Sequence, residues 1–65
     1  MTQKEFLTLL ERNKWMQSKL QTAVKNGGDG LFYFSLGEIF GDLGINGWES
    51  DRFIAKVCKM CDIEW

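Results

Sequence analysis

The chain has 65 residues and a formal net charge of −1, and 45% of its residues are hydrophobic. This composition is typical of a globular chain rather than a disordered one, and the length allows one small core. No apolar run approaches the roughly 20 residues of a membrane-spanning helix, and the charge gives no general attraction to nucleic acid. The two cysteines follow no apolar leader segment, which favours a reducing compartment. We therefore expect a single cytoplasmic domain, residues 1–65, without a membrane partner.

The first expected element is a helix over 2–25. Thr2 and Glu5 have the spacing of a capping box, in which the hydroxyl and the carboxylate bind free backbone N–H groups. Trp15 lies off the apolar stripe, so it either packs against the following loop or contacts a partner. The stripe itself recurs at helical spacing and consists of Phe6, Leu9, Leu10, Met16, Leu20, Ala23 and Val24.

A glycine-rich segment at 26–30 predicts that a loop follows, over 26–34. Three glycines in five residues allow the positive φ values that a helix end and a turn require. The aromatic run at 31–34 would have no pairing partner as a single strand. We therefore expect it to pack as a loop against the helices.

Two further helices are expected in the second half of the chain. Ser35 and Glu38 have capping-box spacing and predict a short helix over 36–43, with Gly44 as its stop. The last helix is predicted over 47–61, with Asn46 as its N-cap. Its buried face would hold Phe53, Ile54, Val57, Cys58 and Cys61, and its opposite face Arg52, Lys56 and Lys59. The sequence thus predicts an all-α fold, a small three-helix bundle.

The stretch 40–65 carries a motif of recognisable spacing. An apolar residue precedes Asp-Leu-Gly at 42–44, a short polar turn follows, and a long helix ends in Asp-Ile-Glu at 62–64. This order resembles acyl carrier proteins, whose motif runs roughly F-x-x-D-L-G-x-D-S-L-D before a helix closing near D-I-E. The resemblance implies a truncated carrier-like bundle. The family's serine, which holds the phosphopantetheine arm, falls on Gly47, so we expect no prosthetic group and no other cofactor.

The other candidates for chemistry have structural explanations. Cys58 and Cys61 form a C-x-x-C, but a zinc site needs four ligands and the chain has no histidine. A redox pair works best at a helix N-terminus, whereas these cysteines lie near a helix end. We expect them to be buried small hydrophobes. The glycine-rich segments complete neither a calcium loop nor a phosphate loop, so we predict no metal site and no enzyme.

The favoured function is a non-catalytic protein-interaction module on the carrier-like fold, not phosphopantetheinylated. Its partner would be an unknown protein or a second copy of the chain, giving a dimer. The inner side of the last helix should be covered by Trp65, Phe32 and Phe34, or by that second copy. The candidate partner-binding residues are Trp48, Arg52, Lys56, Lys59 and Trp15.

The alternative is a helix-turn-helix DNA-binding regulator. Residues 35–43 would form the supporting helix, 44–47 the turn, and the helix over 48–61 would enter the major groove. The basic face of that helix offers no Asn or Gln for reading bases, which makes nucleic acid the less favoured partner.

Overall fold

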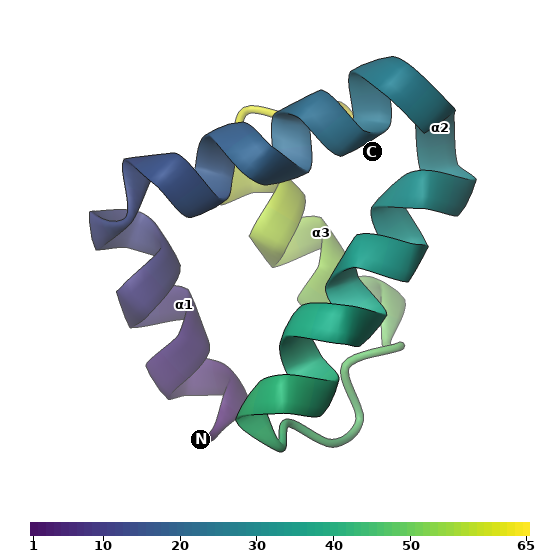
Figure 1. Cartoon of the computed structure of the whole chain (residues 1–65). Coiled ribbons are helices and arrows are strands. Elements are labelled where there is room, and N and C mark those ends of the chain that lie inside the picture. Colours follow the sequence, from purple (N-terminus) through teal and green to yellow (C-terminus); the bar gives the residue numbers. More distant parts are fainter.

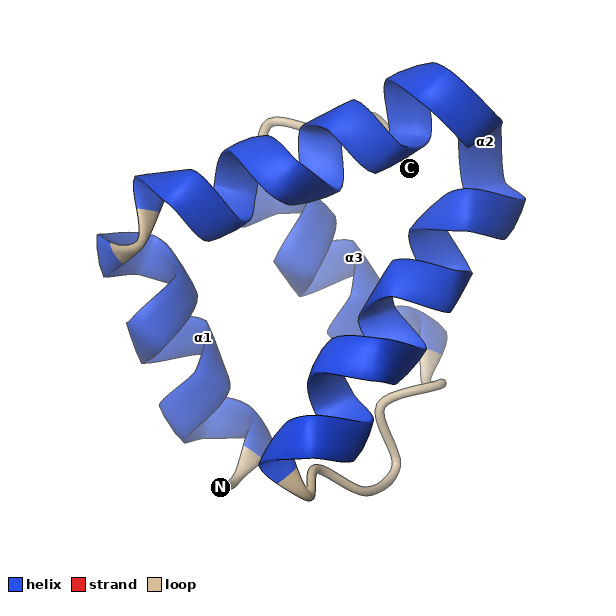
Figure 2. Cartoon of the chain, viewed as in Figure 1, coloured by secondary structure: helices blue, strands red, loops and turns tan.

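The computed structural model describes all 65 residues and contains three helices and no strand (Figure 2). They are α1 (Gln3–Arg12), α2 (Lys14–Leu43) and α3 (Asp51–Met60). The predicted all-α, three-helix fold is confirmed. α2 is bent, and Figure 1 shows that α1 and the two arms of α2 frame the molecule, with α3 lying behind them. The N-terminus lies beside the end of α2.

Asn13 divides the segment that was predicted as one helix over 2–25. Its backbone is not helical (φ −111°, ψ 88°), and its side chain accepts a hydrogen bond from the Met16 N–H at 3.0 Å. Asparagine is a favoured N-cap, so this residue ends α1 and starts α2. The Gln17 side chain donates to the Leu10 carbonyl at 2.8 Å and satisfies a group left free at the end of α1.

The loop predicted over 26–34 is wrong, because α2 continues through it. Only Gly28 leaves the helical backbone (φ 63°, ψ −151°), a conformation open to glycine, and the helix bends there before resuming at Asp29. The neighbouring Gly27 is also required, since a Cβ at this position would overlap the Leu31 side chain. Gly28 therefore ends the first arm of α2, as the glycines predicted, but the second arm begins directly at Asp29 with no loop between them.

The aromatic run is helical because this winding buries one row of large side chains. Phe32, Leu36 and Phe40 are spaced four residues apart, face the same side, and are fully buried. Burying three such side chains outweighs the roughly 1 kcal/mol that each interior glycine costs a helix. The short helix predicted over 36–43 is thus the end of α2, and Ser35 lies inside the helix instead of capping it.

The last helix was predicted over 47–61 but begins at Asp51 and ends at Met60. Its N-cap is Ser50, whose hydroxyl accepts from the Phe53 N–H at 3.4 Å, and not Asn46. The Trp48 ring packs 5.3 Å from the Phe40 ring, between centroids, and holds the preceding chain against α2. The helix can therefore start only after this contact.

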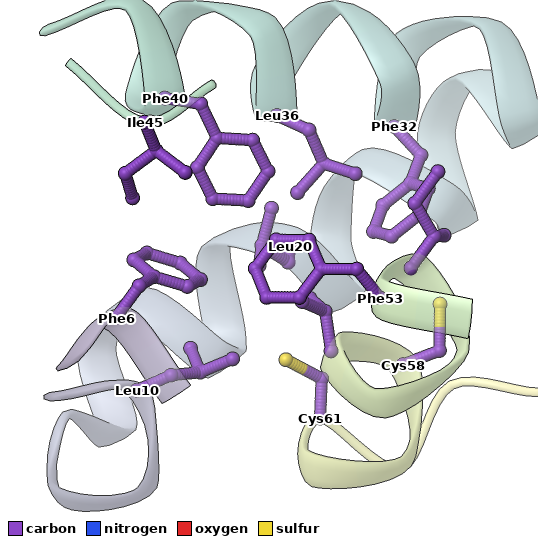
Figure 3. Packing of buried hydrophobic residues seen from close by; sticks show 12 residues of the cluster. Phe6, Leu10, Leu20, Phe32, Leu36, Phe40, Ile45, Phe53, Cys58 and Cys61 are labelled. Atoms are coloured by element: carbon purple, nitrogen blue, oxygen red, sulfur yellow. The ribbon is translucent and has the colours of Figure 1, made fainter. Parts of the chain in front are cut away.

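The core is one cluster to which all three helices contribute (Figure 3). Phe6 of α1 meets Phe40 of α2 edge to face, with ring centroids 4.7 Å apart, and Ile45 lies next to them. The predicted buried face of the last helix is confirmed in full. The cluster contains Phe6, Leu10, Leu20, Phe32, Leu36, Phe40, Ile45, Phe53, Ile54, Val57, Cys58 and Cys61.

Candidate functional site

A cleft of about 600 Å³ lies between the first turns of α1 and α3. Three cationic side chains line it, together with two apolar ones and neutral polar groups, and its lining includes no carboxylate. We call it the cationic cleft. Its lining residues are Thr2, Gln3, Lys4, Leu7, Ser50, Arg52, Phe53 and Lys56.

The α1 wall is organised by the capping box predicted from the sequence. The Thr2 hydroxyl accepts from the Glu5 N–H at 3.1 Å, and the Glu5 carboxylate accepts from the Thr2 N–H at 2.9 Å. The hydrogen bond from the Thr2 backbone holds the pKa of Glu5 below its ordinary value. The capping box is confirmed, and it turns the Glu5 carboxylate to the helix end. Lys4 and Leu7, three residues apart, then face the cleft together.

The α3 wall follows from helical spacing. Arg52 and Lys56 are four residues apart, so they lie one turn above each other on the exposed side of α3. Phe53 lies beside them and is 4% exposed, with its ring 6.4 Å from that of Phe6. The cleft therefore has charged walls above a floor that is continuous with the hydrophobic core.

Hydrogen bonds hold the start of α1 against the end of α2 and the segment that leads into α3. The Gln3 side chain donates to the carbonyls of Asn46 and Gly47, at 3.1 and 3.0 Å, just before α3. The N-terminal ammonium of Met1 donates to the Leu43 carbonyl at 3.3 Å. Gly47 itself has φ 72°, a left-handed conformation that favours glycine. In this structure Gly47, the residue at the predicted carrier position, forms a turn, and its carbonyl accepts the hydrogen bond from Gln3 of α1.

The cleft is electropositive because of its side chains. Lys4, Arg52 and Lys56 supply three full charges. The partial positive charges of the bordering helix N-termini are offset by Glu5 in the first turn of α1 and Asp51 in the first turn of α3. Carboxylate or phosphate groups are the chemical partners that such a site favours.

The predicted partner-binding residues do not form one surface. Arg52 and Lys56 lie in the cationic cleft, whereas Lys59 lines a separate hollow beside the C-terminal segment. Trp48 is half-buried against α2. Trp15 is 71% exposed, so its predicted packing against a loop is wrong, and the Lys19 ammonium lies 5.6 Å from its ring centroid.

Sequence reasoning missed the α1 half of the cleft, including Lys4. Nothing in the sequence pairs residue 4 with residue 52, because the pairing depends on how α1 and α3 pack. The capping box was the only signal, since it placed Thr2 at a helix start where an anion can bind.

The predicted cover of α3 holds in part. Phe32 is fully buried, and its ring centroid lies 5.7 Å from that of Trp65, which also packs on Tyr33. The prediction for Phe34 is wrong, because its side chain is 63% exposed. Phe34 follows Phe32 by two residues, which on a helix places it on the opposite side.

Both cysteines are free and buried, as predicted for small hydrophobes. Burial raises the pKa of the Cys58 thiol, and burial together with the neighbouring Cys58 raises the pKa of Cys61 to about 11. Both are therefore protonated at neutral pH. No three His, Cys, Asp or Glu side chains gather into a metal-binding group, and none of the helices combines the length and apolarity needed to cross a membrane.

Comparison with known proteins found no match among protein-family models, curated proteins or solved structures.

Proposed function

We propose that this protein is a non-catalytic interaction module that binds an acidic segment of a protein in the cationic cleft. The observation that carries the proposal is the composition of the lining, with Lys4, Arg52 and Lys56 on the walls and no carboxylate among them. Leu7 and Phe53 at the floor add an apolar contact. A segment with both acidic and apolar side chains would satisfy the whole lining.

The magnitude of each contribution supports a weak, reversible complex. An exposed ion pair contributes about 0.2–1 kcal/mol, so three cations alone give little affinity. Burial of one apolar side chain adds about 1.5–3 kcal/mol. Together these contributions reach about 4–6 kcal/mol at their upper end, so we expect dissociation constants on the order of 0.1–1 mM, in the range of small, transient interfaces.

The test is a titration of the protein with a short amphipathic peptide, followed by backbone amide chemical shifts. The peptide carries two glutamates and one phenylalanine at helical spacing, and a second peptide replaces both glutamates by glutamine. We expect shifts at the cleft with the first peptide and at least tenfold weaker binding of the second. Equal binding of the two peptides, or none up to millimolar concentration, would contradict the proposal.

Lys56→Glu and Lys59→Glu form a matched pair for this titration. They make the same charge change on the same exposed side of α3, but only Lys56 lines the cleft. We expect Lys56→Glu to weaken peptide binding by about tenfold and Lys59→Glu to leave it within about twofold. Similar losses in both variants would assign the binding to the general charge of α3.

DNA binding through α3 is the second candidate, and one observation favours it: Arg52, Lys56 and Lys59 are all exposed along α3. Two acidic residues, Glu49 and Asp51, flank the N-cap of this helix and would oppose the phosphate backbone. Retention on duplex DNA that falls with salt, and that Lys56→Glu and Lys59→Glu weaken equally, would establish this candidate in place of the first.

The family hypothesis remains a carrier-like module without a prosthetic group. The absence of a hydroxyl at Gly47 and the use of the Ser50 hydroxyl as the cap of α3 support the lack of a prosthetic group. Incubation with a phosphopantetheinyl transferase of broad specificity should leave the mass of the protein unchanged. A gain of one phosphopantetheine group would refute this part of the proposal.

A further inference from the structure

We propose that the acidic segment bound by the cationic cleft is supplied by a second copy of this chain, so that copies associate head to tail. The inference rests on the proposed function, since it uses the same cleft. The segment is the outward side of the second arm of α2, which we call the outer face. It consists of Leu31, Phe34, Glu38 and Asp42.

The outer face is exposed and combines the two properties that the cleft requires. Leu31 is 41% and Phe34 is 63% exposed, although both are large hydrophobic side chains. Glu38 and Asp42 are exposed one and two turns beyond Phe34. At 100° per residue these four positions fall within one narrow arc of the helix, opposite the buried row of Phe32, Leu36 and Phe40.

The spacing of the charges matches between the two surfaces. Glu38 and Asp42 are four residues apart on α2, and Arg52 and Lys56 are four residues apart on α3. At a rise of 1.5 Å per residue, both pairs span about 6 Å along their helix axes. Two carboxylates of one copy can therefore face two cations of another, with Lys4 on the opposite wall as a third cation.

The apolar groups complete this pairing. Phe34 precedes Glu38 by one turn, so its ring lies at the end of the carboxylate row. Within one chain this ring has no buried position, while the cleft of another copy offers the half-buried Leu7, next to the small exposed part of Phe53. Removing this ring from water would add the apolar contribution that exposed ion pairs alone do not supply.

The two surfaces belong to different elements, so the contact is heterologous. The cleft is formed by α1 and α3, and the outer face points away from the core on α2. One chain cannot fill its own cleft in this way. A chain of copies joined in this way has a free cleft at one end and a free outer face at the other. It either grows further or closes into a ring, and it does not form a symmetric pair.

The experiment is sedimentation velocity of the full chain over a range of protein and salt concentrations, with two charge-reversal variants. The face variant is Glu38→Lys/Asp42→Lys, and the cleft variant is Arg52→Glu/Lys56→Glu. We expect the wild type to associate with rising concentration and to dissociate in 0.5 M NaCl, because exposed ion pairs are screened. Each variant alone should be monomeric, and an equimolar mixture of the two should associate again.

The mixture tests whether the two reversed surfaces pair with each other. The cationic outer face of the first variant fits the acidic cleft of the second, and their unchanged surfaces also fit each other. A control with the same number of reversals elsewhere, Lys59→Glu/Glu11→Lys, should associate as the wild type does. Phe34→Ala should weaken association by about tenfold. Circular dichroism of each variant checks that the helices remain.

The outcomes distinguish this inference from the proposed function. A wild type that stays monomeric at millimolar concentration while its cleft still binds the acidic peptide overturns only the self-association. A mixture that does not associate, or a control variant that fails to associate, also overturns it. Absence of both peptide binding and self-association overturns the two proposals together.

Discussion

The C-terminal ends of α2 and α3 are built alike and differ in one residue. At the end of α2 the Ile45 N–H donates to the Phe40 carbonyl at 2.9 Å, and at the end of α3 the Ile63 N–H donates to the Cys58 carbonyl at 2.8 Å. A second hydrogen bond of 3.4 Å lies inside each of these: the Gly44 N–H donates to the Gly41 carbonyl, and the Asp62 N–H donates to the Lys59 carbonyl. Both ends are therefore Schellman motifs.

The residue that adopts the left-handed conformation differs between the two ends. It is Gly44 with φ 67° after α2 and Asp62 with φ 59° after α3. This conformation raises the conformational free energy of a residue with a Cβ by roughly 1–2 kcal/mol, whereas glycine adopts it without this strain. The following isoleucine is 4% exposed at Ile45 but only half-buried at Ile63. The end of α2 is therefore less strained and better packed than the end of α3, and it directs the chain toward α3 and the cationic cleft.

Removing the two isoleucine side chains gives the largest expected difference. Ile45→Ala should lower the free energy of unfolding by about 2–4 kcal/mol, because its side chain is enclosed beside Phe6 and Phe40. Ile63→Ala should cost about 1 kcal/mol, since water already reaches that side chain. Urea unfolding measures both. Equal losses would show that the two ends are packed equally well.

Gly44→Ala is expected to have the next largest effect, a loss of about 1–2 kcal/mol, because the left-handed φ is retained. Gly41→Ala is the matched control. Gly41 lies within the helix, and an added Cβ meets no atom within 4 Å. The Gly41→Ala substitution should therefore raise the free energy of unfolding by up to about 1 kcal/mol. Thermal or urea unfolding measures both changes. If the free energy of unfolding changes in the same direction in both variants, the role given to Gly44 is contradicted.

Much of the fold was predictable where a signal is local. The capping box at Thr2 and the buried face of α3 depend on residues within two turns of each other, and both were found. The end at Gly44 was also predicted. The glycines at 27 and 28 do end the first arm of α2, but the loop predicted after them is wrong, because a second helical arm begins at once. What decides between a loop and a second arm is the burial of Phe32, which is a tertiary effect.

The candidate site was predictable only on one side. Arg52 and Lys56 stood out because they are four residues apart, but Lys4 joins them only through the packing of α1 on α3. The two segments that carry the carrier resemblance, at 42–44 and 62–64, coincide with the two Schellman ends. Sequence spacing alone does not separate a family motif from a pair of helix ends with the same geometry.

The second helix end also predicts a dependence on alkaline pH. Cys61 has a pKa of about 11 in the fold against an ordinary 9.0, so the unfolded chain loses this proton first. The stability that the protonated thiol contributes is complete below pH 9 and is lost as the pH rises from 9 toward 11. At pH 10 the loss is on the order of 1 kcal/mol. Urea unfolding at pH 8 and pH 10 measures it.

The control for this measurement is Cys61→Ala, which removes this thiol but leaves the Cys58 thiol, whose pKa burial also raises. The variant should lose less stability between pH 8 and pH 10 than the wild type. An identical loss in both proteins would show that other groups cause the alkaline dependence.

Asp62→Gly gives the smallest expected effect and the most direct test of the comparison. Glycine adopts the left-handed φ without strain, and the exposed Asp62 side chain lies outside the core, so the substitution should stabilise the protein by about 0.5–1 kcal/mol. Asp62→Ala keeps the strain and controls for loss of the charge near the helix end. If Asp62→Gly and Asp62→Ala unfold at the same urea concentration, the strain at this end is negligible, and the difference between the two ends reduces to the packing of their isoleucines.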